Sequence, residues 1–261
     1  ERYQAAGDFN AQLAKNLYFR LVGVYRDSGT DVDFVKDDAA IVMPSLTYDN
    51  GTTRLTAMVE VSDRDSDTSS QFLPLAATAC LSDQVTVIGG NACAAAGPYE
   101  LDSSTYLGEP GFNRYDTNST LFSLLGSHAF SENFSVDGIF RYKDGEADYR
   151  QSYPAFPGAG VPRMTPTGDT QRVFYWSDAG SEQTALDIRA RYAFETGILE
   201  HEVFVGAAYQ NVTTSNRYIY GVETDLFNVY NPVYDGYPAM FVDPANFYDP
   251  GDSTTEDHGL Y

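Results

Sequence analysis

Apolar and polar residues alternate strictly between Ala185 and Phe194. Every second residue of this segment is apolar or small, and the residues between them are charged: Asp187, Arg189 and Arg191. Successive side chains of a β-strand point to opposite faces, so the alternation predicts a strand with one apolar and one charged face. The apolar face ends in aromatic residues next to a short turn at Glu195–Gly197. This arrangement is typical of a strand that faces lipid.

The same alternation recurs along most of the chain. It predicts eight long strands, at residues 3–13, 17–27, 39–48, 54–62, 115–130, 134–153, 171–194 and 201–221. Residues 65–113 and the segment from 222 to the C terminus show no sustained period, so we expect long loops there. The Asn50–Gly51 dipeptide favours a tight hairpin turn between the third and fourth strands.

The connections between these strands alternate in length. Short turns are expected near residues 15, 50, 132 and 197, and long connections at 29–38, 65–113, 155–169 and from 222 onward. Outer-membrane barrels combine short periplasmic turns with longer extracellular loops, so the odd-numbered strands are expected to run toward the periplasm. We therefore predict that residues 1–261 form one all-β domain, an antiparallel up-and-down segment of a transmembrane β-barrel.

The composition excludes some partners. The chain has 37 Asp and Glu residues against 16 Lys and Arg, which gives a formal net charge of -21. This charge repels phosphates, so no nucleic-acid partner is expected. No run of 18 apolar residues occurs, so a transmembrane helix is not expected. The chain begins at Glu1 and not at Met, and we interpret it as an internal piece of a longer protein.

Short segments spread over most of the chain resemble the barrel of TonB-dependent siderophore receptors. The matching segments are Phe19–Ser28, Pro44–Tyr48, Thr53–Thr56, Gln71–Pro74, Gly108–Asp116, Phe140–Tyr142, Asp148–Arg150, His201 and Val205–Gly206. The resemblance implies a Gram-negative outer-membrane protein that contacts lipid, carries ferric siderophore as its transported ligand and has no resident cofactor. It also implies energy supply by the TonB–ExbB–ExbD complex. By this resemblance we expect the chain to correspond to approximately the second to ninth strands of such a barrel, in its N-terminal half, without the N-terminal coupling region, the plug domain and the remaining strands.

Two alternative functions stay open at this point. An outer-membrane porin, or a TonB-dependent transporter for another solute, follows the same barrel pattern. A secreted, soluble β-protein that binds carbohydrate would turn its apolar stripes inward. Enzymatic activity is not expected, because His128, His201 and His258 are scattered and no phosphate-loop, metalloprotease or nucleophile-elbow motif occurs.

Aromatic residues high on the strands and in the loops are the candidate ligand contacts. They are Tyr106, Tyr153, Phe156, Tyr175, Trp176, Tyr218 and Tyr220. A ferric chelate is bulky and often anionic, so aromatic faces suit it, as do the cations Arg172 and Arg150. The strand at 171–194 is longer than the about ten residues that cross a membrane, which places Tyr175 and Trp176, the strongest candidates, outside the lipid. The alternative is that the aromatics pack between strands and that each Arg pairs with a neighbouring carboxylate.

The two cysteines, Cys80 and Cys93, lie in one polar stretch. In an oxidising compartment we expect them to form a disulfide that closes a loop tip, with two free thiols as the alternative. A metal site is not expected, because no His lies near them and their spacing does not match a zinc-ligand pattern. The acidic run Asp63–Asp67 departs from a calcium-binding loop at Thr68 and Pro74, so we interpret it as a solvated loop.

Overall fold

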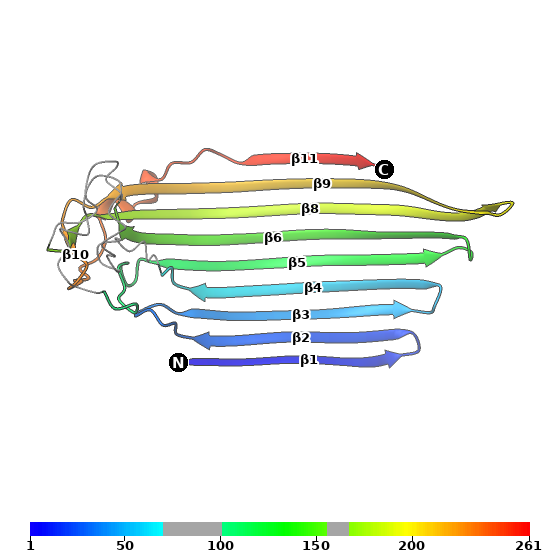
Figure 1. The fold of residues 1–261 in the computed structure, drawn as a ribbon, viewed down its shortest axis with the longest axis horizontal. Helices are drawn as coiled ribbons and strands as arrows, with labels where there is room; N and C mark the ends of the chain where they lie inside the picture. The colour runs from blue at the N-terminus through cyan, green and yellow to red at the C-terminus, as the bar shows by residue number, and fades with distance from the viewer. Residues whose placement is uncertain (70–100, 156–166) are drawn as a thin grey trace.

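The computed structural model describes residues 1–69, 101–155 and 167–261, and its main feature is a nine-stranded antiparallel sheet (Figure 1). The order in the sheet is β1-β2-β3-β4-β5-β6-β8-β9-β11, so consecutive long strands lie side by side. The strands are β1 (Arg2–Ala14), β2 (Leu17–Ser28), β3 (Asp37–Asp49), β4 (Thr53–Ser66), β5 (Arg114–Ala129), β6 (Phe134–Pro154), β8 (Arg172–Thr196), β9 (Leu199–Val222) and β11 (Ser253–Leu260). The long connections contain the small pair of β7 (Asp169–Thr170) and β10 (Phe227–Asn228) and the 3-10 helices η1 (Ala239–Phe241) and η2 (Pro244–Asn246). Neither of these helices in the described residues is long and apolar enough to cross a membrane.

The structure confirms the eight strands that the alternation predicts and adds a ninth. The expectation of a loop from residue 222 to the end is wrong for its last part, because β11 pairs with β9 from Ser253 to Leu260. Both faces of β11 carry polar residues, so alternation gives no signal, and backbone hydrogen bonds to β9 define the strand. The solvated-loop interpretation of Asp63–Asp67 is also wrong in part. β4 continues to Ser66, and Asp65 forms an ion pair with Lys36 at 2.5 Å.

The two ends of the sheet differ as predicted. The short turns lie at one end and the long connections at the other (Figure 1). Gly51 (φ 88°) and Gly197 (φ 64°) supply the left-handed backbone conformation in two of the short turns. β6, β8 and β9 have 21, 25 and 24 residues, about twice the length that crosses a membrane. In a membrane barrel, their loop-side halves would extend beyond the lipid.

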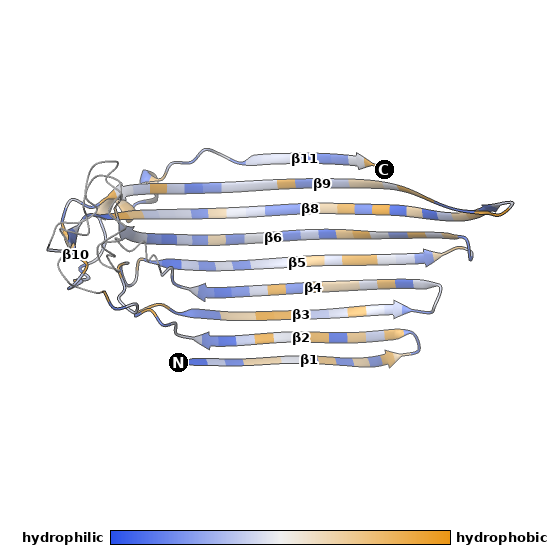
Figure 2. Ribbon diagram, in the orientation of Figure 1, coloured by the Kyte–Doolittle hydropathy of each residue, from blue (hydrophilic) through white to orange (hydrophobic). Residues whose placement is uncertain are grey.

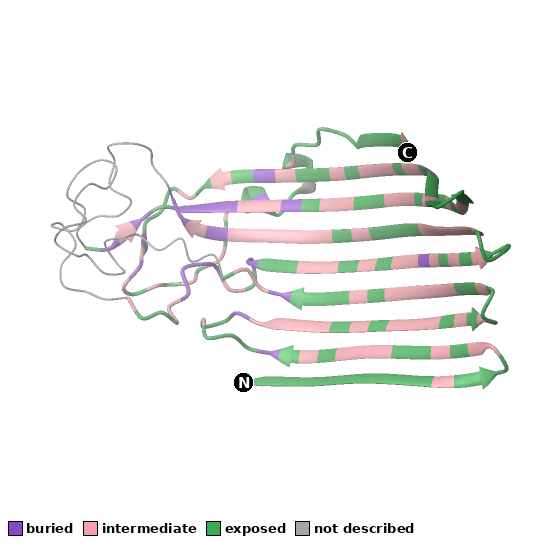
Figure 3. Cartoon of the chain, turned by 45° about the vertical axis from the view of Figure 1, so that its right-hand side comes forward, coloured by how far each residue is buried: buried purple, intermediate pink, exposed green. Residues whose placement is uncertain are grey.

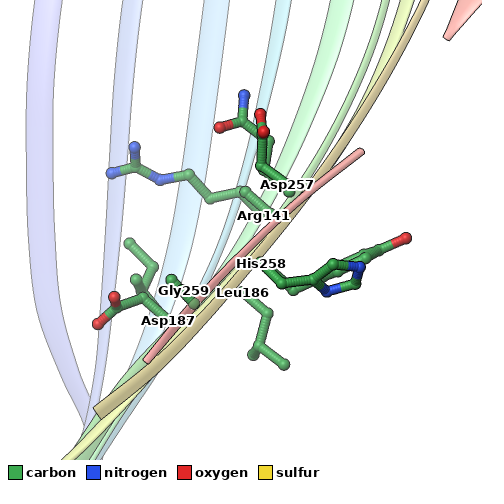
Figure 4. Close-up of a pocket in the computed structure, with 11 residues that line it drawn as sticks. Arg141, Leu186, Asp187, Asp257, His258 and Gly259 are labelled. Atoms are coloured by element: carbon green, nitrogen blue, oxygen red, sulfur yellow. The ribbon is translucent and has the colours of Figure 1, made fainter. Parts of the chain in front are cut away.

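The curvature of the sheet separates polar from apolar side chains. Figure 4 shows Arg141, Asp187 and Asp257 on the concave side of the sheet and Leu186 and His258 on the convex side. The register from β4 to β9 runs without a bulge, so alternate residues keep the same face along each strand. Apolar and polar residues accordingly alternate along the turn-side half of β8 (Figure 2).

The convex face is apolar and uncovered over its turn-side half. Phe9, Ile188 and Tyr192 are 60%, 46% and 51% exposed. The concave face instead carries ion pairs between neighbouring strands: Arg20–Asp8 at 2.7 Å and Arg189–Asp137 at 2.6 Å. Apolar side chains that point outward around a polar interior are the arrangement of a membrane barrel. A soluble β-protein would instead turn these apolar side chains inward, so the observed arrangement is opposite to what the soluble alternative predicts.

Most of the buried residues lie at the loop end (Figure 3). One cluster consists of Leu107, Phe227 and Val229, and a second of Phe112, Phe174, Ile219 and Phe241. Each cluster joins residues of different connections. The described parts of the connections after β4 and after β9 are therefore folded against one another and against the ends of β8 and β9.

Candidate functional site

Five tyrosines form a row across the loop-side half of the sheet. They are Tyr115 on β5, Tyr149 on β6, Tyr175 on β8, Tyr218 on β9 and Tyr248 in the connection before β11, and we refer to them as the tyrosine row. Their ring centroids follow one another at 5.5, 6.0, 6.1 and 5.4 Å. Aromatic rings attract one another at these separations. The row is therefore one continuous aromatic surface that runs perpendicular to the strands.

Strand geometry places the row on the concave, polar face. Tyr175 lies an even number of residues from Asp187 on β8, so both side chains point to the same side. Tyr149 and Tyr218 are the register neighbours of Ser177, which shares that side. Ser177 Oγ donates a hydrogen bond of 2.6 Å to Asn216 Oδ1. Hydroxyl and amide groups thus accompany the rings in the middle of the row.

One end of the row carries positive charge. The Arg64 guanidinium lies 5.8 Å from the Tyr115 ring centroid. Arg64 and Arg26 both pair with Asp37, at 2.8 and 2.7 Å. Two guanidinium groups share one carboxylate, so these three side chains together carry one positive charge in a chain that is acidic overall. This end of the row is suited to attract an anionic ligand along the aromatic surface.

The row is partly accessible. Tyr115 is 39% exposed, and Tyr220, which lies opposite Tyr175 in the register, is 55% exposed. Tyr149, Tyr175 and Tyr218 are half-buried. Tyr153 is half-buried and lies on the same face of β6, nearer the loops. The rings of the row are therefore partly open to solvent on the concave face.

Trp176 lies on the opposite face from Tyr175. Its ring packs under the Arg150 guanidinium at 3.8 Å and edge-on against Phe247 at 4.8 Å. Its buried Nε1 has no hydrogen-bond partner among the described residues. The sequence predicts Tyr175 and Trp176 as the strongest candidate contacts, and of the two the structure brings only Tyr175 into the row. The position of Trp176 favours the packing alternative.

Arg172 and Tyr106 are buried away from the row. Each is 1% exposed. Arg172 pairs with Glu109 at 2.7 Å, as the carboxylate alternative predicts. The Tyr106 carbonyl accepts a hydrogen bond from the Tyr234 hydroxyl at 2.7 Å, and burial raises the pKa of the Tyr106 hydroxyl. Both positions favour a structural role. The candidate contact Phe156 and the cysteines Cys80 and Cys93 lie outside the described residues, so those predictions stay untested.

Sequence reasoning missed four residues at this site: Tyr115, Tyr149, Tyr248 and Arg64. Alternation assigns each of the first two to a strand, but it does not say which residues of neighbouring strands lie side by side. Only the register shows that Tyr115 lies opposite Tyr149.

Comparison with known proteins decides what kind of sheet this is. No protein-family model matches the chain. The ferrioxamine B receptor of Salmonella typhimurium is 25% identical over 237 residues, which cover 90% of this chain and 31% of that receptor. The ferric-catecholate import receptor Fiu of E. coli superposes with a TM-score of 0.77 at 16% identity, and the match covers 99% of this chain and 36% of Fiu. The chain has the fold of a siderophore-receptor barrel.

Further solved structures share this fold. The siderophore receptor PiuA of Acinetobacter baumannii gives a TM-score of 0.73 at 15% identity, with 99% of this chain and 38% of PiuA covered. The ferripyoverdine receptor of the outer membrane of Pseudomonas aeruginosa gives 0.69 at 16% identity, with 100% and 32% covered. The chain thus spans about a third of the length of the proteins it matches. These proteins are receptors, and the ferripyoverdine receptor is a protein of the outer membrane; this chain shares their barrel fold.

Proposed function

We propose that this chain forms part of the barrel wall of a TonB-dependent outer-membrane receptor that takes up ferric siderophores. The tyrosine row contacts the ferric chelate on the concave face. The observation that carries the proposal is the continuity of the row across β5, β6, β8 and β9, with Arg64 at one end. Aromatic rings offer flat contact area, tyrosyl hydroxyls donate hydrogen bonds to chelate oxygens, and the arginine attracts anionic chelates.

The two faces of the sheet support different partners in this proposal. The exposed apolar side chains of the convex face contact outer-membrane lipid. Release of the chelate into the periplasm requires energy, which the TonB–ExbB–ExbD complex supplies through a region outside this chain. The plain alternative, a diffusion porin, requires no energy and no high-affinity aromatic surface.

Uptake of radiolabelled iron tests the proposal. The complete polypeptide is expressed in an iron-starved Gram-negative host that lacks its own siderophore receptors. The probes are ferrioxamine B, a ferric catecholate, ferripyoverdine and ferric citrate, because similar proteins carry these names. We expect accumulation of at least one chelate that stops when the proton-motive force is dissipated. Energy-independent entry of small sugars, without saturable chelate binding, would support the porin and contradict the proposal.

Variants of the row sharpen this test. The double variant Tyr149→Ala/Tyr175→Ala removes two adjacent rings and is expected to weaken chelate binding about tenfold or more. Tyr209→Ala is the matched control, because Tyr209 pairs opposite Leu186 and points to the convex face. Equal affinity of the double variant and the control would contradict the assignment of the site.

A further inference from the structure

Arg172, the first residue of β8, lies at the centre of a buried ionic cluster. Its Nη1 donates to Glu109 Oε2 at 2.7 Å and its Nε donates to Glu223 Oε2 at 3.0 Å. Its Nη2 lies 3.7 Å from Asp235 Oδ1. The side chains of Arg172 and Glu109 are 1% and 3% exposed. Solvent therefore contributes little to the Arg172–Glu109 pair, whereas Asp235, with a side chain 73% exposed, lies at the solvent edge of the cluster.

The guanidinium group is held from several directions. The Phe227 and Phe174 ring centroids lie 4.5 and 5.2 Å from its central carbon. The Gly108 carbonyl accepts a longer hydrogen bond of 3.4 Å from Nη1. A planar guanidinium stacks on rings and directs its N–H groups to several carboxylates at once, and a lysine ammonium does not. The site thus specifies arginine.

The cluster joins three connections that are far apart in sequence. Glu109 belongs to the connection between β4 and β5, Arg172 follows the connection between β6 and β8, and Glu223 and Asp235 lie in the connection after β9. Backbone bonds reinforce the junction: the Glu223 amide donates to the Arg172 carbonyl at 2.8 Å. The Gly236 amide donates to Glu109 Oε1 at 3.1 Å. One guanidinium therefore touches all three.

The connection after β9 leads from this cluster to the tyrosine row. Phe241, in the middle of this connection, is buried in the apolar cluster that also contains Phe112 and Phe174. At its far end, Tyr248 and Tyr218 exchange two backbone hydrogen bonds, of 2.8 and 3.0 Å. The connection is thus fixed at its start by Arg172, in its middle by apolar packing and at its end against the row.

We infer that Arg172 is a positioning residue: it holds the described parts of three long connections, residues 101–113, 167–172 and 223–250, together as one cap, and this cap holds Tyr248 against Tyr218 at the end of the row. The role of Tyr248 in ligand contact rests on the proposed function. The cap itself does not. Loss of the guanidinium leaves the buried Glu109 and the half-buried Glu223 without a cation, so the cap opens as a unit and Tyr248 leaves the row.

Amide hydrogen exchange of the complete polypeptide, with no chelate added, tests the cap. For Arg172→Gln we expect about tenfold or more faster exchange in residues 105–113, 223–236 and 246–250 together, with β1 to β4 unchanged. Arg217→Gln is the matched control, because Arg217 forms an exposed pair with Asp178 on the same strands. Faster exchange confined to residues near 109 and 223, with Tyr248 still protected, would overturn the inference.

Two further measurements keep the test decisive. If Arg172→Gln does not assemble, Arg172→Lys retains the charge but not the planar fork, and we expect the same three segments to exchange faster to a smaller extent. In a chelate-binding assay we expect Arg172→Gln to weaken affinity and Tyr248→Ala to weaken it to a similar extent. A cap that opens without any change in chelate affinity would contradict only the ligand role of Tyr248, whereas a cap that stays closed would contradict the role of Arg172.

Discussion

Tyr175 and Trp176 are neighbours on β8, yet their side chains lie on opposite faces of the sheet. The Tyr175 ring lies 6.0 Å from Tyr149 and 6.1 Å from Tyr218 in the tyrosine row. The Trp176 ring packs against Arg150 and Phe247 on the other side. One face of the loop-side half is thus available to a ligand, while the other is covered by the connection that leads to β11.

Alanine substitution separates these two positions. Tyr175→Ala is expected to lower chelate affinity with a small effect on stability, because Tyr175 is half-buried on the open face. Trp176→Ala is expected to lower the free energy of unfolding by about 2–3 kcal/mol, because it removes packing against the covering connection. Thermal unfolding in detergent and chelate titration of both variants check this. A loss of affinity in Trp176→Ala without a loss of stability would contradict the assignment of the two faces.

Charge placed on the convex face should be costly. Ile188→Arg points a guanidinium into the lipid and is expected to lower the free energy of unfolding by about 2–4 kcal/mol. Ala185→Arg lies on the concave face of the same strand and should be tolerated. Urea unfolding in phospholipid vesicles measures both. Similar stability of the two variants would favour the soluble alternative over a membrane barrel.

The cap should become more stable as the pH falls through the raised pKa of Glu109 toward the ordinary pKa of a glutamate. Burial raises the pKa of Glu109 above that of an exposed glutamate, and Asp235 adds to this, while Arg172 and the Gly236 amide oppose it. A carboxyl group with a raised pKa takes up a proton on folding, so its contribution to stability is lost as the pH rises through the folded-state pKa. Limited proteolysis of residues 223–236 across this range measures the effect. Glu109→Gln should reduce the dependence of the proteolysis rate on pH. If the pH dependence is unchanged in this variant, it arises from a titratable group other than Glu109.

The disulfide between Cys80 and Cys93 stays a prediction. In protein isolated without reductant, we expect both thiols to be protected from alkylation and to become reactive after reduction. Peptide mass spectrometry measures this directly. Alkylation of either cysteine before reduction would support the free-thiol alternative.

The fold was more predictable than the site. Alternation of side chains specifies a strand with two distinct faces. On β8, the apolar Leu186 indicates the face toward the lipid, and the charged Asp187 indicates the face toward the barrel interior. β11 has polar residues on both faces, so the sequence offers no period from which to predict it. The tyrosine row depends on which residues of four different strands lie side by side, and Arg172 pairs with Glu109 across the fold. Neither of these contacts between distant residues can be predicted from the pattern within a single sequence segment.

Thiol labelling in intact cells tests the central claim most directly. Tyr175→Cys is made in a background in which Cys80 and Cys93 are serine, and it is labelled with a membrane-impermeant maleimide with and without saturating chelate. Asp178→Cys, exposed on the opposite face of β8, is the control. The account predicts that a transported chelate protects Cys at position 175 and leaves position 178 reactive. Equal labelling of position 175 with and without every chelate that the cells take up would contradict it.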